Sequence, residues 1–239
     1  EYTKPWVQRF ELWLDSRSKS DRGYQLVMTD QIPNAQHQTL IQFDAHPSSL
    51  QLLQKMIANS LEHLLPNAMA ITSNQFHDEH VHQARVAIRR LRSALQFFKK
   101  QIPSLPHTWS MQLAAVFRQL GSTRDRDAVT LHLLPKLKAA DSPVVYLPPS
   151  DKEIARIDHV FKTPDTVNLI LSLLQFSQTH LPSQDLHPIK ALRKQFNQLH
   201  NRICKDALDF SELEVAARHT KRKQLKCLRY NVEFLQSLF

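Results

Sequence analysis

Two segments of the sequence carry a histidine followed by cations at the same intervals. The first segment begins at His82 and the second at His219, and in both the cations follow three, seven and ten residues later. These cations are Arg85, Arg89 and Arg92 in the first segment and Arg222, Lys226 and Arg229 in the second. Arginine offers phosphate oxygens a planar pair of donors, and lysine offers a compact charge. The repeated pattern therefore points to the binding of an anion.

On a helix, the four positions of each segment form one stripe, which we call a ladder. Successive residues turn by about 100° and rise by about 1.5 Å, so a ladder covers an arc of about 80° and a length of about 15 Å. Each ladder borders an apolar seam, formed by Val81, Ala84, Ile88, Leu91, Leu95 and Phe98 in the first segment and by Leu225, Leu228, Val232 and Leu235 in the second. Like charges four residues apart destabilise a helix. We therefore expect an external anion to neutralise the ladders.

The composition indicates a globular, all-α protein with an anionic partner. Of the 239 residues, 42% are hydrophobic and 22% are charged, and only 2 are glycine. The 13 prolines lie between long stretches of helical periodicity, which favours helices joined by turns. The net charge of +9 and the pI of about 9.7 suit nucleic acid, an acidic membrane surface or a smaller polyanion.

The helical period divides the chain into four parts. We predict a linker or the remnant of a preceding domain over residues 1–47, a four-helix bundle over 48–140, a proline-rich connector over 141–150 and a second four-helix bundle over 151–239. The expected helices cover about 48–66, 77–101, 109–120, 122–139, 151–161, 164–180, 186–208 and 211–238. Within residues 1–47 the spacing is helix-like over 2–14, but the pieces 24–28 and 39–43 are prone to form strands. A basic cleft is expected between the two antiparallel bundles.

The same sequence indicates a soluble, cytoplasmic protein. No apolar run approaches the ~18 residues of a membrane-spanning helix, and no signal-peptide pattern opens the chain. The two cysteines, Cys204 and Cys227, form no metal-binding or disulfide pattern, which favours a reducing compartment. We expect no membrane partner. The chain begins with Glu1 rather than Met, which suggests a piece of a longer protein.

Three motifs in order resemble those of the CHAD domain, the conserved-histidine α-helical domain. The first runs from His82 to Arg92. The second, Leu120-Gly121-Ser122-Thr123-Arg124-Asp125-Arg126-Asp127, is similar to the family's Leu-Gly-x-x-Arg-Asp-x-Asp element, with Ala128 in place of its usual valine. The third runs from His219 to Tyr230. The resemblance covers about residues 48–239 and implies two four-helix bundles around a basic cavity that binds inorganic polyphosphate, without enzymatic activity and without a cofactor.

A shorter resemblance concerns the N-terminal part. Residues 18–26 look like the exit from a CYTH domain, the triphosphatase-type module to which CHAD domains are often fused. A fused or associated CYTH domain is therefore an expected partner. The resemblance to the CHAD domain, with the polyphosphate binding that it implies, makes polyphosphate granules an expected location.

Direct contacts with polyphosphate are assigned to the six ladder cations. Arg90 and Lys223 are expected at the rim of the site. A third, weaker ladder lies in the expected helix over 186–208. It supplies two secondary candidates for polyphosphate contacts, Arg193 and His200. The ladder histidines His82 and His219 should take up protons when a polyanion binds, because the anion favours their charged form.

Three alternatives remain open from the residues. The first is a metal-dependent phosphohydrolase, for which His77, Asp78, Glu79, His80 and His82 offer ligands, although the neighbouring cations would repel a metal ion. The second is binding of an RNA backbone in the same cleft, although the ladders contain no interleaved aromatic residue apart from Tyr230. The third is docking of an acidic protein tail. We expect residues 122–127 to cap a helix, and we expect no metal site and no enzyme.

Overall fold

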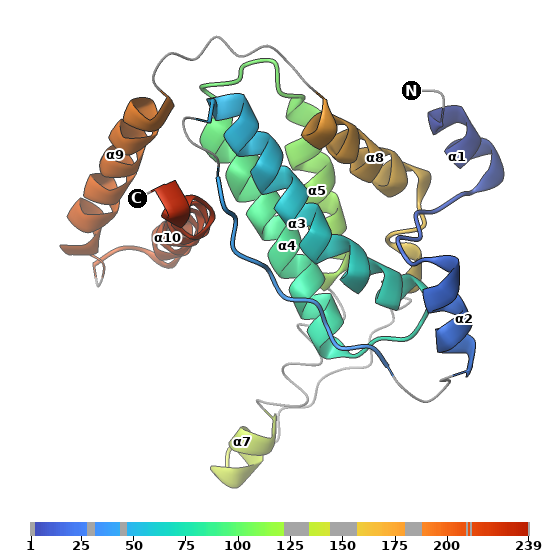
Figure 1. Cartoon of the computed structure of the whole chain (residues 1–239). Coiled ribbons are helices and arrows are strands. Elements are labelled where there is room, and N and C mark those ends of the chain that lie inside the picture. Colours follow the sequence, from blue (N-terminus) through green and yellow to red (C-terminus); the bar gives the residue numbers. More distant parts are fainter. Residues whose placement is uncertain are drawn as a thin grey trace. The chain divides into compact units, whose positions relative to one another are not determined.

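A computed structural model describes residues 3–27, 32–43, 47–121, 134–143, 157–179, 188–208, 210 and 212–238. Every regular element among these residues is helical, which confirms the all-α class (Figure 1). No helix within the described ranges is long and apolar enough to cross a membrane.

The first helices are α1 (Lys4–Phe10) and α2 (Lys19–Val27). The prediction of a strand-prone piece over 24–28 is wrong for residues 24–27, which belong to α2. A reciprocal cap begins this helix, because the backbone N–H of Ser18 donates to the Asp21 carboxylate and the backbone N–H of Asp21 donates to the Ser18 hydroxyl. Local capping therefore outweighs the strand propensity of Tyr24 and its neighbours.

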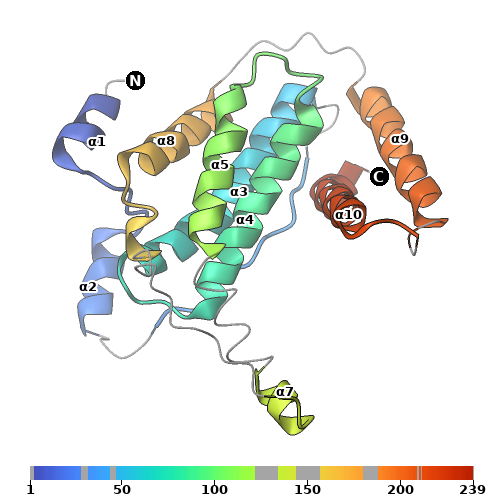
Figure 2. The ribbon, with the colours of Figure 1, turned by 180° about the vertical axis from the view of Figure 1, so that it is seen from behind.

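Helices α3 (Ser49–Thr72) and α4 (Asp78–Phe98) lie side by side in both views of the ribbon (Figures 1 and 2). The predicted cap at the start of α3 is confirmed: the backbone N–H of Ser48 donates to the Gln51 side chain, and the backbone N–H of Gln51 donates to the Ser48 hydroxyl. The helix continues six residues past Pro66, which costs one backbone hydrogen bond. Burial of the residues that follow, such as Met69 and Ile71, compensates for that loss.

The chain forms two compact units, and three of the boundaries between them fall inside α3, α4 and α8 (Pro164–Gln178). One unit comprises Glu1–His37, Leu61–Ile88 and His107–Ser172, and the other comprises Gln38–Ser60, Arg89–Pro106 and Leu173–Phe239. The division into bundles at 48–140 and 151–239 remains a prediction. Residues 144–150 of the predicted connector and the cap at 122–127 lie outside the described residues.

The first unit also contains α5 (His107–Gln119), α7 (Leu134–Ala139), the 3-10 turn η2 (Ile157–His159) and the start of α8 (Pro164–Gln178). The second unit contains the end of α8, then α9 (Pro188–Leu208), α10 (Val215–Leu235) and the 3-10 turn η3 (Gln236–Leu238). Most predicted helices are present within a few residues of their expected ends. Two predictions are matched only in part. Within 122–139 the described part is the helix Leu134–Ala139, and within 151–161 the described part forms only a 3-10 turn.

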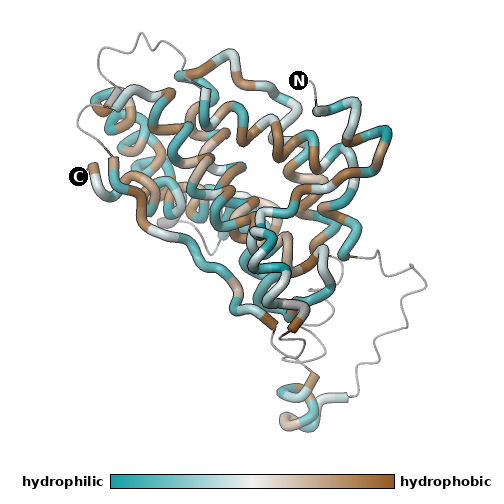
Figure 3. Tube along the Cα trace, turned by 45° about the vertical axis from the view of Figure 1, so that its right-hand side comes forward, coloured by the Kyte–Doolittle hydropathy of each residue, from teal (hydrophilic) through white to brown (hydrophobic). Residues whose placement is uncertain are grey.

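Helix α4 is enclosed on most of its circumference. Its predicted seam is confirmed, because all six residues from Val81 to Phe98 are buried. The small residues Ala87 and Ala94 and the larger Phe97, which lie outside this seam, are buried as well. Hydrophobic and hydrophilic positions alternate along the helices (Figure 3). In α4, burial of the seam and of the residues beside it leaves little exposed surface for the first ladder.

Candidate anion-binding site

The first ladder lies on α4 and is only partly accessible. His82, Arg89 and Arg92 are half-buried, and Arg85 is buried, with 6% of its surface exposed. The ladder therefore combines a fixed, buried guanidinium with three side chains that reach solvent in part.

The buried guanidinium of Arg85 is held at the end of α5. Its Nη1 donates to the backbone carbonyl of Leu120 at 3.2 Å, and its Cζ lies 4.6 Å from the centre of the Phe117 ring. A Cβ atom at position 121 would lie 2.9 Å from Nη1, so the absence of a side chain at Gly121 leaves room for the guanidinium. The C-terminal end of a helix attracts a positive charge. The Leu-Gly pair of the second motif thus positions an arginine of the first motif.

Arg90 lies in the interior rather than at the rim, which corrects the expectation from the sequence. Only 2% of its surface is exposed. Its Nη2 donates to the side-chain oxygen of Asn59 at 3.1 Å, its Nη1 donates to the Glu233 carboxylate at 3.3 Å, and its Cζ lies 4.0 Å from the centre of the Phe234 ring. Burial lowers the pKa of Arg90, and the charge of Glu233 opposes that effect. Arg90 therefore joins α3, α4 and α10 within the second unit.

The second ladder lies on α10 and is exposed along its length. His219, Arg222, Lys226 and Arg229 all reach solvent, as does Lys223. Arg229 forms an ion pair with Glu233 at 3.2 Å, and its Cζ lies 4.8 Å from the centre of the Tyr230 ring. Glu233 thus bridges a buried arginine and an exposed ladder arginine.

The predicted seam of α10 is wrong for Leu225 and Val232, whereas Leu235 is buried as predicted and Leu228 is half-buried. Leu225 and Val232 are 54% and 50% exposed, and the buried residues of this helix are Tyr230, Asn231, Phe234 and Leu235. The buried face is therefore turned by about one residue, or about 100°, from the predicted one. The ladder remains exposed because it lies well away from the buried face.

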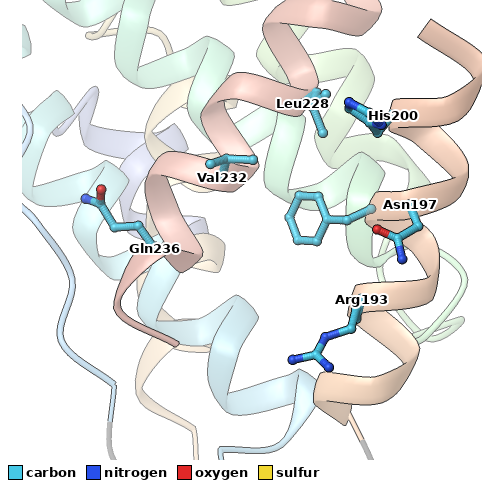
Figure 4. Close-up of a pocket in the computed structure, with 7 residues that line it drawn as sticks. Arg193, Asn197, His200, Leu228, Val232 and Gln236 are labelled. Carbon is cyan, nitrogen blue, oxygen red and sulfur yellow. The ribbon is translucent and has the colours of Figure 1, made fainter. Parts of the chain in front are cut away.

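The third, weaker ladder lies on α9, where Arg193 and His200 are exposed. Both line a pocket of about 560 Å³ between α9 and α10, together with Phe196, Asn197, Leu228, Val232 and Gln236. Figure 4 shows Arg193 and His200 at the two ends of this pocket and Leu228 and Val232 across from them. A sequence pattern of cations alone did not reveal the apolar part of this surface.

The histidines at the start of α4, His77 and His80, contact each other. The Nδ1 atoms of His77 and His80 lie 3.2 Å apart, and the backbone N–H of His77 also donates to His80. Burial and the neighbouring His77 lower the pKa of His80. Among the described residues, no three side chains of histidine, cysteine, aspartate or glutamate are placed to hold a metal ion.

The sequence analysis did not identify the residues that hold Arg90 and Arg229 in place. Asn59, Glu233 and Phe234 come from helices far apart in the sequence, and none belongs to a repeated pattern. One signal was present for Glu233, which follows Arg229 by four residues and so faces it on a helix.

The comparisons with known proteins show to which family this chain belongs. The sequence profile of the CHAD domain matches residues 55–239. This chain belongs to the CHAD domain family. Its fold is similar to the crystal structure of the CHAD domain from the plant Ricinus communis, with a TM-score of 0.65 and 23% sequence identity over 84% of this chain and 70% of that one. A comparison with curated proteins finds no significant match.

Proposed function

We propose that this chain is a non-catalytic module that binds inorganic polyphosphate. The observation that carries the proposal is the exposed ladder of α10, where Arg222, Lys226 and Arg229 line one stripe of a 21-residue helix. The resemblance of the ladders to the CHAD motifs supports polyphosphate as the polyanion.

A linear polyphosphate suits a row of cations because it carries negative charge along its whole length. The rungs from Arg222 to Arg229 extend over about 10 Å of the helix, so one chain could contact several of them together. Charge-assisted hydrogen bonds to phosphate are strong, and the exposed cations of the ladder can reach a ligand in solvent. Arg229 would exchange its ion pair with Glu233 for a contact with phosphate. Lys223 would contact the anion from the side of the ladder.

The ladder of α4 would contribute to polyphosphate binding with only part of its cations. Arg89 and Arg92 are accessible enough to contact a phosphate, whereas Arg85 is already held by Leu120 and Phe117. We propose that Arg85 acts mainly through its fixed charge. We further propose that polyphosphate binding directs the chain to polyphosphate granules, and that a CYTH domain, where one is attached, acts beside this module.

RNA is the main competing ligand, because phosphate contacts dominate binding to both polymers. The proposal predicts that long-chain polyphosphate displaces labelled RNA at a lower phosphate concentration than RNA displaces labelled polyphosphate. The measurement is a competition assay by fluorescence anisotropy at two salt concentrations. Equal potency of the two polymers would refute polyphosphate selectivity and would leave general attraction between charges as the explanation.

A further inference from the structure

The pocket between α9 and α10 differs in chemistry from the ladders beside it. Its walls are formed largely by Phe196 and, across from it on α10, by Leu228 and Val232. An inorganic phosphate chain gains nothing from such walls, because it has no apolar part to bury. The volume of about 560 Å³ lies within the range typical of small-molecule sites.

The aromatic wall of the pocket is held in place from α4. The Phe196 ring packs against the ring of Phe97, with 4.7 Å between the ring centres, and Phe97 is buried. The side chain of Gln195 donates to the backbone carbonyl of Phe97 at 2.8 Å and also hydrogen-bonds to Gln101. These contacts fix the adjacent turn of α9. Phe196 is therefore a positioned platform rather than a mobile surface side chain.

The polar groups of the pocket suit a ligand with two different parts. Arg193 and His200 stand seven residues apart, about 10 Å along α9, and Figure 4 places them at opposite ends of the pocket. Asn197 and Gln236 add amide groups that can both donate and accept hydrogen bonds. A ligand that matches this set has an aromatic, hydrogen-bonding part and an anionic part.

We propose that this pocket binds a nucleoside polyphosphate. The base lies against Phe196 and contacts Leu228 and Val232, and the phosphates lie toward Arg193. An alkyl phosphate would match the cation and the apolar walls but would make no hydrogen bonds to the amides of Asn197 and Gln236. This inference rests in part on the proposed function, since both assign phosphate binding to cations of the second unit.

The test compares ATP with inorganic tripolyphosphate by isothermal titration calorimetry in metal-free buffer. Tripolyphosphate carries at least as much charge as ATP, so tighter binding of ATP must come from the nucleoside. We expect ATP to bind about tenfold more tightly, the lower end of what stacking of one base on an aromatic side chain provides. Octyl phosphate should bind more weakly than ATP.

Two variants of α10 test whether the preference for ATP over tripolyphosphate arises in this pocket. Val232→Trp fills the pocket from an exposed position and should abolish the preference for ATP while leaving tripolyphosphate binding unchanged. Leu225→Trp is the matched control, because Leu225 is a similarly exposed residue of the same helix outside the pocket. It should keep the preference.

The outcomes separate this inference from the proposed function. Equal affinity for ATP and tripolyphosphate, or a preference that survives Val232→Trp, would overturn the nucleotide site even if long-chain polyphosphate binds tightly. Octyl phosphate binding as tightly as ATP would also overturn it, because the pocket would then select only an apolar group. A preference for ATP that is lost in Val232→Trp supports the site even if long-chain polyphosphate shows no selectivity over RNA.

Discussion

Replacing Glu233 by glutamine should lower stability and raise the affinity for polyphosphate at the same time. The carboxylate contacts Arg90 at 3.3 Å with one oxygen and Arg229 at 3.2 Å with the other. Glutamine has a similar shape but carries no charge, and one end of its amide is a donor that cannot pair with a guanidinium. The substitution therefore weakens both contacts with little change in packing.

The loss of stability follows from the position of Arg90. Two unit charges 3.3 Å apart attract by about 5 kcal/mol at an effective dielectric constant of 20 and by about 1.3 kcal/mol at that of water. The side chain of Arg90 is 3% exposed but that of Glu233 is 36% exposed, so solvent screens the pair substantially. We expect a net loss of about 1 to 2 kcal/mol, because Asn59 and Phe234 still hold the guanidinium.

The gain in affinity follows from the position of Arg229. Its pairing with Glu233 is an exposed contact between residues four apart, worth about 0.3 to 0.5 kcal/mol. A bound phosphate must compete with that contact. Removing the competitor should tighten polyphosphate binding by about twofold.

The assays are thermal unfolding followed by circular dichroism and titration with labelled polyphosphate. For a chain of this size, the expected fall in Tm is about 2 to 8 °C. Glu214→Gln is the matched control, since Glu214 is exposed, precedes α10 and makes no capping hydrogen bond with its side chain. An unchanged Tm would refute the structural role of Glu233. Weaker polyphosphate binding than in the control would show that Glu233 orders Arg229 for the ligand instead of competing with it.

Two further predictions concern groups whose pKa is shifted by burial. The pKa of His80 is lowered by burial and by His77, so the unfolded chain binds more protons and stability should fall as the pH drops below about 6.5. His80→Gln should reduce that pH dependence in unfolding measurements between about pH 7 and pH 5, whereas His37→Gln, at an exposed site, should not. Burial raises the pKa of Cys227, while Cys204 is exposed. A thiol reagent should therefore modify Cys204 at least about tenfold faster, and Cys204→Ser should remove the fast phase; two equal rates would contradict this.

The sequence predicted α4 well because its apolar residues repeat at three and four positions without a break. Val81 to Phe98 provide five turns of consistent spacing, and such a pattern fixes both the helix and its buried face. It could not show that positions beside the seam are buried too. Ala87 and Ala94 are compatible with exposure, and only packing in three dimensions decides that they are covered.

The buried face of α10 was predicted incorrectly for a related reason. Leu225 and Val232 are aliphatic and fit a helical seam, but burial of Tyr230 and Phe234 is favoured because large rings remove more apolar area from water. Phe234 also packs under the guanidinium of Arg90, a contact from another helix that no local pattern contains. The ladder cations themselves were identified correctly as one stripe on each helix, whereas their role in binding remains a prediction.

The most direct test of the central proposal is the affinity of long-chain polyphosphate for Arg222→Ala/Lys226→Ala. Both residues are exposed, so the variant should fold normally. The control, Lys136→Ala/Lys138→Ala, removes the same charge from exposed positions of α7. We predict a loss of at least about tenfold in the ladder variant and a much smaller change in the control, with a weaker dependence of binding on salt in the ladder variant. Equal losses in both variants would contradict the proposal, because net charge alone would then account for binding.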